Sequence, residues 1–295
     1  MPMKLQLTLD SPSVEDCLDL VLATRDSVDI IEVGYPLLVE EGLSLVRHVK
    51  HAFPDKTVLA DAKIFHSGGY VSEKCFEYGA DVVSVMGLAS DETFRAVLGV
   101  AQQHAGHVVG DLAGIEGYVA RALELETLGV RSVVVPSGLG ADGAELSEVS
   151  DLGEAGNAAP LEALRELNEQ LSHVMVAVVG HIGMDTIDRV VEAEPDIVLV
   201  GRAIVSASDP RGAAAALKAK MGEILRRVRP QGCLRRARMS APRAPVRTSR
   251  PPTPMPEFAP PTSRTCRSCR LSRHAAWRSL PVSARGHTAS SGTPS

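Results

Sequence analysis

The chain has 295 residues, of which 44% are hydrophobic, 23% charged and 3% aromatic, and its formal net charge is −5. This composition excludes a wholly disordered polypeptide, and the length accommodates one large domain or two ordinary ones. No apolar run approaches the roughly 18 residues that a membrane-spanning helix needs, and no secretory signal is visible. We therefore expect a cytoplasmic protein that does not enter a membrane.

The charge is divided unevenly along the chain. Residues 226–295 hold 15 arginines and a single acid, Glu257, for a net charge of +14, which leaves −19 for residues 1–225. The same segment holds 11 of the 19 prolines and little periodicity. We predict a folded domain over 1–225 and a disordered Arg/Pro-rich tail over 226–295. The tail lacks interleaved aromatic residues and any known binding motif, which disfavours nucleic acid as a partner.

Residues 1–225 repeat one unit, in which a short β-branched apolar run is followed by a longer amphipathic helical pattern. Ser13, Ser90 and Pro160 are helix-start signals for three of these patterns. Apolar strands separated by helices are typical of a parallel sheet covered on both faces. The repeat therefore predicts an α/β fold, a closed (β/α)₈ TIM barrel, with a doubly wound open sheet as the alternative. The predicted strands are Leu5–Leu9, Val28–Val33, Thr57–Ala60, Val82–Met86, Val108–Gly110, Ser132–Val135, Val174–Val179 and Ile197–Val200.

One stretch interrupts this repeat after the sixth predicted strand. Residues 138–159 are polar, acidic and rich in glycine. A connection of this length without a structural pattern of its own is often functional. We interpret it as an inserted loop and a candidate mobile flap.

Charged residues gather at the ends of the predicted strands, where a TIM barrel builds its active site. Asp10 follows the first strand, Glu32 lies in the second, Asp61 ends the third with Lys63 two residues later, and Asp111 ends the fifth. Several carboxylates at a buried mouth repel one another unless a cation offsets them. Oxygen ligands without grouped His or Cys favour magnesium over zinc. Each aspartate taken alone could instead cap the following helix.

The last two strands end in a glycine followed by a basic residue, Gly180-His181 and Gly201-Arg202. Glycine lets backbone amides approach an anion, a helix N-terminus adds positive potential, and arginine supplies a two-pronged hydrogen bond. TIM barrels often bind phosphate in the loops after strands seven and eight. These residues predict a phosphate site, although the glycines could serve only tight turns.

Four segments carry a more specific signal: Lys4–Asp10, Val28–Gly34, Phe53–Ile64 and Gly201–Ile204. Together they resemble the orotidine 5′-monophosphate decarboxylase suprafamily over residues 3–225. Within it, they are most similar to the branch of 3-hexulose-6-phosphate synthase and 3-keto-L-gulonate-6-phosphate decarboxylase. The resemblance implies a (β/α)₈ homodimer that binds a sugar phosphate and holds magnesium through Glu32 and Asp61. It also implies that Lys63 is the cationic acid–base residue, that Asp10 and Asp111 line the sugar, and that Gly180, Gly201 and Arg202 hold phosphate.

Three positions depart from the family pattern. His66 stands where the Asp-x-Lys-x-x-Asp signature closes, a position that in the family reaches across the dimer interface. It is either a structural residue or a general acid–base group with a near-neutral pKa. Pro136 stands where relatives tend to place a proton-transferring His, and His181 replaces the second glycine of the phosphate loop.

The resemblance implies enediolate chemistry on a ketose phosphate with a bound magnesium ion. The leading interpretation is an aldehyde-lyase like 3-hexulose-6-phosphate synthase, which adds ribulose 5-phosphate to formaldehyde. A hexulose-6-phosphate 3-epimerase is the close alternative, because Lys63 and His66 could act as two opposed acids. A keto-gulonate phosphate decarboxylase and a non-catalytic sugar-phosphate binder follow. Orotidylate decarboxylation is disfavoured, because it needs the aspartate that His66 replaces.

Overall fold

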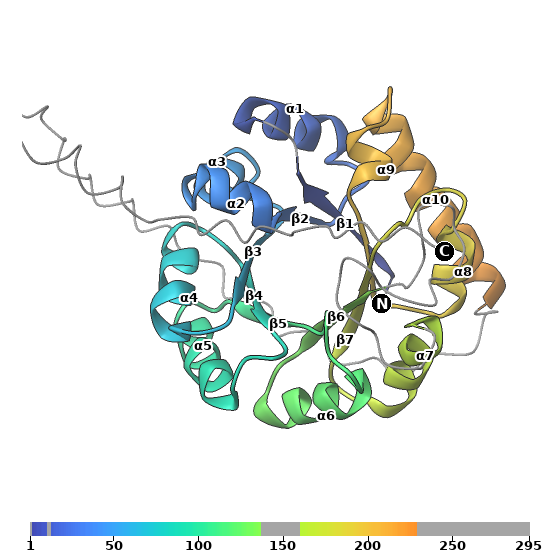
Figure 1. The fold of residues 1–295 in the computed structure, drawn as a ribbon. Coiled ribbons are helices and arrows are strands. Elements are labelled where there is room, and N and C mark those ends of the chain that lie inside the picture. Colours follow the sequence, from blue (N-terminus) through green and yellow to red (C-terminus); the bar gives the residue numbers. More distant parts are fainter. Residues whose placement is uncertain (1, 11–12, 137–159, 229–295) are drawn as a thin grey trace, which may run out of the picture. The chain divides into compact units, whose positions relative to one another are not determined.

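The computed structural model describes residues 2–10, 13–136 and 160–228. Within these residues, eight parallel strands pair in chain order, and β1 also pairs with β8, which closes a barrel. Figure 1 shows the strands as an inner ring with the helices outside it. The predicted TIM barrel is therefore confirmed, and the open sheet is excluded. The strands are β1 Lys4–Leu9, β2 Ile30–Val33, β3 Thr57–Ile64, β4 Val82–Met86, β5 His107–Asp111, β6 Ser132–Pro136, β7 Met175–Val179 and β8 Ile197–Val200.

Helices connect the strands, and three of them begin where the sequence indicates, after Ser13, after Ser90 and at Pro160. Ser13 Oγ accepts a hydrogen bond from the amide of Asp16 at 3.1 Å, and Ser90 Oγ accepts one from the amide of Thr93 at 3.2 Å. These caps satisfy amides that a helix leaves unpaired at its start. The helices are α1 Val14–Thr24, α2 Tyr35–Glu41, α3 Ser44–Ala52, α4 Gly68–Glu77, α5 Asp91–Gln103, α6 Tyr118–Leu128, α7 Pro160–Gln170, α8 Ile187–Glu192, α9 Arg202–Val205 and α10 Pro210–Val228.

The core lies mainly between the barrel and the helices. Alternate strand residues point outward into this layer, and Leu5, Leu7 and Leu9 of β1 are 0% exposed there. The other residues of each strand point into the barrel, because successive side chains alternate between the two faces of a strand. A smaller apolar cluster that includes Leu59 of β3 and Leu199 of β8 lies in the barrel interior.

Several predictions concern residues outside the described ranges. The inserted loop at 138–159 and most of the tail are among them. Helix α10 continues to Val228, so residues 226–228, which composition placed in the tail, are helical. None of the helices in the described ranges combines the length and apolarity needed to cross a bilayer.

Candidate active site

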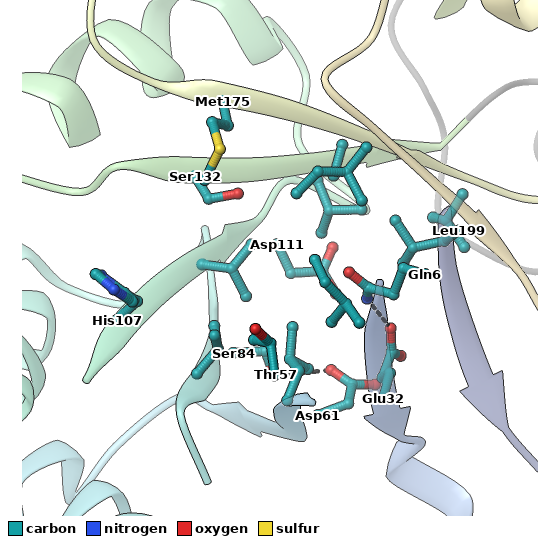
Figure 2. A pocket seen from close by; sticks show the side chains of 18 of the residues that line it. Gln6, Glu32, Thr57, Asp61, Ser84, His107, Asp111, Ser132, Met175 and Leu199 are labelled. Carbon is teal, nitrogen blue, oxygen red and sulfur yellow. Dashed lines mark hydrogen bonds between the residues drawn. The ribbon is translucent and has the colours of Figure 1, made fainter. Parts of the chain in front are cut away.

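Three carboxylates and a lysine meet at the carboxyl end of the barrel. Glu32 of β2, Asp61 of β3 and Asp111 of β5 are only 6%, 8% and 5% exposed. With Lys63 they line one end of a pocket inside the barrel. Figure 2 shows Glu32 and Asp61 as neighbours at this end, with Gln6 reaching Glu32 along a dashed line. The structure therefore brings together four of the predicted site residues.

An irregularity in β3 positions two of these residues. The predicted strand stops at Ala60, but β3 continues to Ile64. Between Ala60 and Ile64 its register against β4 shifts, since these two residues pair with Val83 and Val85. Lys63, inside this bulge, has a φ of 42°, which is uncommon for a residue with a side chain. A bulge of this kind redirects side chains, and here Asp61 and Lys63 both face the pocket.

Lys63 is held between two carboxylates. Its Nζ lies 2.6 Å from Asp111 Oδ2 and 3.2 Å from Asp61 Oδ2. Burial by itself would lower the pKa of Lys63, but the charges of Asp111 and then Asp61 outweigh burial and raise this pKa above its ordinary value. Asp111 also accepts a hydrogen bond from the amide of Ala113 at 3.0 Å. Lys63 is consequently an ammonium ion at neutral pH, suited to donate a proton and to stabilise negative charge.

Two buried polar residues that the sequence reading missed organise this cluster. Ser84 Oγ donates to Asp61 Oδ1 at 2.7 Å and accepts from the amide of Lys63 at 2.8 Å, so it connects both functional residues to β4. Gln6 Nε2 donates to Glu32 Oε2. Both residues point inward from otherwise apolar strands and are at most 3% exposed. A polar residue at an inward position of a barrel strand was the available signal.

Glu32 and Asp61 have the chemistry of a magnesium site. Burial, and next the charge of Asp61, raise the pKa of Glu32 to about 8, while the hydrogen bond from Gln6 and the charge of Lys63 act in the opposite direction. Within the described ranges, no group of three or more His, Cys, Asp or Glu side chains is placed to hold a metal ion together. Magnesium commonly uses one or two carboxylates and completes its shell with water and substrate. The two buried carboxylates therefore fit this ion, whose charge would offset their repulsion.

Asp10 follows β1 and lies close to the backbone of the neighbouring loops. Burial, with a smaller contribution from Asp61, raises its pKa. A Cβ atom built on Gly34 would lie 2.3 Å from Asp10 Oδ1 and 2.9 Å from the carbonyl oxygen of Leu9. Only glycine leaves room for the aspartate here, so Gly34 holds Asp10 in place at the mouth.

We expect Gly34→Ala to displace Asp10 and to lower the free energy of unfolding by about 1–3 kcal/mol, because the Leu9 carbonyl is backbone and yields little. Urea denaturation measures this loss. Gly99→Ala is the matched control, since Gly99 lies in α5 with nothing within 4 Å of a built Cβ. An unchanged unfolding free energy in Gly34→Ala would contradict the close approach.

The predicted phosphate residues line a second pocket of about 540 Å³ on the carboxyl side of β7 and β8. Gly180 and His181 have φ values of 111° and 43°, so their loop turns sharply at both residues. Thr186 Oγ1 stabilises the loop by donating to the carbonyl of His181 at 3.1 Å and accepting from the amide of Gly183 at 3.0 Å. The pocket also includes Asp10, Gly201 and Arg202, so the structure brings all four predicted residues together beside Asp10, which the resemblance assigns to the sugar.

His66 and Pro136 lie outside the lysine cluster. His66 is exposed, and its Nδ1 lies 3.0 Å from Ser67 Oγ. Neither residue lines the pocket that contains Lys63. Pro136 is the last residue of β6 and pairs with Val179 of β7. His66 is therefore not part of the lysine cluster of its own chain, and its role as a general acid or base, including one across a dimer interface, stays a prediction.

Comparisons with known proteins identify the family of the chain. A model of the orotidine 5′-phosphate decarboxylase / HUMPS family matches residues 3–217. The 3-hexulose-6-phosphate synthase of Mycobacterium gastri is 37% identical over 217 residues, which cover 74% of this chain and 99% of that protein. The crystal structure of the synthase from Salmonella typhimurium is 32% identical, has a TM-score of 0.65, and is matched over 77% of this chain and 100% of its own.

A third relative is a decarboxylase and not a synthase. A crystal structure of KGPDC from Streptococcus mutans is 25% identical, with a TM-score of 0.65, and the match covers 76% of this chain and 99% of that one. All these matches span the barrel, so the barrel is the part of the chain that is shared. The chain belongs to the orotidine 5′-phosphate decarboxylase / HUMPS family.

Proposed function

We propose that the protein is a 3-hexulose-6-phosphate synthase, an aldehyde-lyase that joins ribulose 5-phosphate to formaldehyde and catalyses the reverse cleavage. The observation that carries this proposal is the match to the Mycobacterium gastri synthase, at 37% identity over 99% of that protein. The decarboxylase of the branch, at 25% identity, is less similar. Carbon–carbon bond chemistry on a sugar phosphate is common to both.

The two pockets divide the substrate between them. The phosphate binds at Gly180, Gly201 and Arg202, and the sugar chain extends past Asp10 toward Lys63. When bound by Glu32 and Asp61, magnesium would polarise the ketone and its neighbouring hydroxyl, so that the proton on C1 becomes acidic. Asp111, whose carboxylate lies beside Lys63, takes this proton. The ammonium group of Lys63 stabilises the negative charge of the enediolate, because it is held beside the reacting carbons by Asp61 and Asp111.

The bond-forming step then follows from the charge distribution. C1 of the enediolate attacks the aldehyde carbon, the π electrons of the aldehyde move to its oxygen, and that oxygen takes one proton. Lys63 is the adjacent donor of this proton. Asp111, whose Oδ2 is 2.6 Å from Nζ, then passes the proton it took from C1 to Lys63. The product is a six-carbon 3-ketose 6-phosphate.

The direct test is proton NMR in deuterated buffer with magnesium. Ribulose 5-phosphate alone should exchange a C1 proton for deuterium, and a hexulose phosphate should appear only after formaldehyde is added. Deuterium entering C3 of fructose 6-phosphate, with a new epimer, would instead establish the epimerase. If ribulose 5-phosphate neither exchanges nor reacts, the synthase assignment is wrong.

We expect Arg202→Ala to raise the KM for ribulose 5-phosphate about tenfold or more, since a charge-assisted hydrogen bond contributes roughly 1.5–3 kcal/mol. The kcat should change less, because Arg202 acts on the phosphate and not on the reacting carbons. Steady-state kinetics measures both constants. Arg95→Ala is the control, because Arg95 is an exposed residue of α5 that pairs only loosely with Asp91, at 3.6 Å. Equal KM values in the two variants would mean that Arg202 does not bind the phosphate.

A cytoplasmic homodimer completes the proposal. Large apolar side chains are exposed in the segments that follow three neighbouring strands, β2, β3 and β4. Tyr35 and Val39 are 45% and 68% exposed, Phe65 and Tyr70 are 56% and 70% exposed, and Leu88 is 58% exposed. A patch of this kind favours association with a second copy.

A further inference from the structure

The interior of the barrel is filled less tightly than the layer between barrel and helices. Outward-facing residues such as Leu7, Val133 and Val198 are 0% exposed. The apolar residues of the interior cluster all keep some accessible surface, although side chains usually pack a TIM barrel interior into a solid core. A water-sized space therefore reaches each of them. Their exposed fractions are Ile30 6%, Leu59 6%, Val109 5%, Val134 9%, Ala177 3%, Ile197 4% and Leu199 7%.

This space is a cavity of about 210 Å³ that extends along the barrel. Its one end is the cluster of Glu32, Asp61, Lys63 and Asp111 described above. Its other end is formed by residues at the starts of strands, which in a parallel barrel all lie on the opposite face. Arg131 belongs to this end and is exposed, so the cavity approaches solvent there. Residues of both ends are labelled in Figure 2, and the second end comprises Lys4, Thr57, Val82, His107, Arg131, Ser132 and Met175.

The lining of the middle section selects against ions. A sugar phosphate would lose its hydration among Leu59, Val134 and Ala177 without gaining polar partners, which is costly. Its phosphate site also lies outside this cavity, beside Gly201 and Arg202. A small uncharged molecule meets neither obstacle. The cavity therefore suits a small uncharged substrate that must reach Lys63.

We propose that this barrel cavity binds the one-carbon aldehyde and leads it from the amino-terminal face of the barrel to Lys63. The inference rests on the proposed synthase function. The ketose phosphate, which occupies the carboxyl-terminal mouth, would cover the cluster from that side. The aldehyde then approaches the enediolate from the cavity, on the amino-terminal side of the cluster. There its carbon meets C1 and its oxygen meets the ammonium group of Lys63.

Filling the cavity tests this route. Ala177 lies in the middle of β7, opposite Val134 and Ile197 on the neighbouring strands, so Ala177→Leu places three more carbon atoms in the cavity. We expect the KM for formaldehyde to rise at least about fivefold, because the aldehyde loses its site and its path. The exchange of C1 deuterium into ribulose 5-phosphate without formaldehyde should stay within about twofold, since the ketose reaches only the end of the cavity at Lys63 and not its middle section at Ala177.

Two further variants make the test decisive. Met175→Trp narrows the cavity at its far end and should raise the same KM, and it replaces Ala177→Leu if that variant does not fold. Ala216→Leu, at an exposed position of α10, is the matched control and should leave both readouts unchanged. Unaltered formaldehyde kinetics in the folded cavity variants would overturn the inference. Loss of exchange and of turnover in the wild-type protein would overturn the proposed function instead.

Discussion

Replacing Lys63 by methionine should lower kcat/KM by about 10³-fold, because general acid–base catalysis alone contributes roughly 10²–10⁴-fold. Lys63 is the cation that lies between Asp61 and Asp111, at 3.2 and 2.6 Å. Its removal deletes the proton donor and also leaves two buried carboxylates facing each other without a positive charge. Lys63→Met should therefore lower both the rate of the chemical step and the melting temperature. Single-turnover kinetics and thermal unfolding measure the two effects.

Two companion variants separate catalysis from stability. Lys63→Arg keeps a positive charge between the carboxylates, so it should restore most of the melting temperature but not the turnover. Lys50→Met is the matched control, because Lys50 pairs with Asp81 at 2.8 Å and neither residue lines the pocket that contains Lys63. It should lose stability and keep the kcat of its folded fraction. If Lys63→Met turned over as fast as Lys50→Met, Lys63 would not be the acid–base residue.

Glu32→Gln should abolish stabilisation by magnesium and yet stabilise the metal-free protein at pH 8. The pKa of Glu32 is raised from 4.5 to about 8 by burial and by Asp61. The unfolded chain therefore ionises this carboxyl above pH 4.5, while the folded protein keeps it protonated up to about 8. Folding stability falls as the pH rises through this window, because the unfolded state releases the proton first.

A neutral amide avoids this cost and can still accept the hydrogen bond from Gln6. In chelator, Glu32→Gln should melt above the wild-type protein at pH 8, and the difference should shrink toward pH 5. With magnesium, the wild-type melting temperature should rise by mass action, and that of Glu32→Gln should not. Thermal scans at both pH values, with chelator and with magnesium, measure this. Glu40→Gln, an exposed residue of α2, is the control and should behave as wild type. A magnesium shift that persists in Glu32→Gln would exclude this residue as a ligand.

Loss of activity should accompany the gain in stability. Buried like charges are costly, and a protein retains them where the site needs them. We expect turnover in Glu32→Gln to fall even at saturating magnesium. If Glu32→Gln were more stable and as active as the wild-type protein, Glu32 would have no role in catalysis.

The sequence by itself determined the barrel and the approximate position of its site. All eight strands could be located, because alternation between apolar runs and amphipathic helices is a local property of the chain. Once the repeat is recognised as a parallel barrel, the ends of the strands must share one face, so Glu32, Asp61 and Asp111 could be placed together. The resemblance to the family added the acid–base assignment of Lys63 and the choice of Glu32 and Asp61 as magnesium ligands.

Only the tertiary structure decided how these residues contact one another. The extension of β3 beyond Ala60 depends on a register shift against β4, and no local pattern encodes such a shift. Ser84 reaches Asp61 across 23 positions of the chain, and Gln6 reaches Glu32 across 26. The barrel cavity likewise exists because side chains from opposite strands do not meet in the barrel interior. These features come from long-range packing, which periodicity cannot report, because it records which face a residue occupies and not what that face meets.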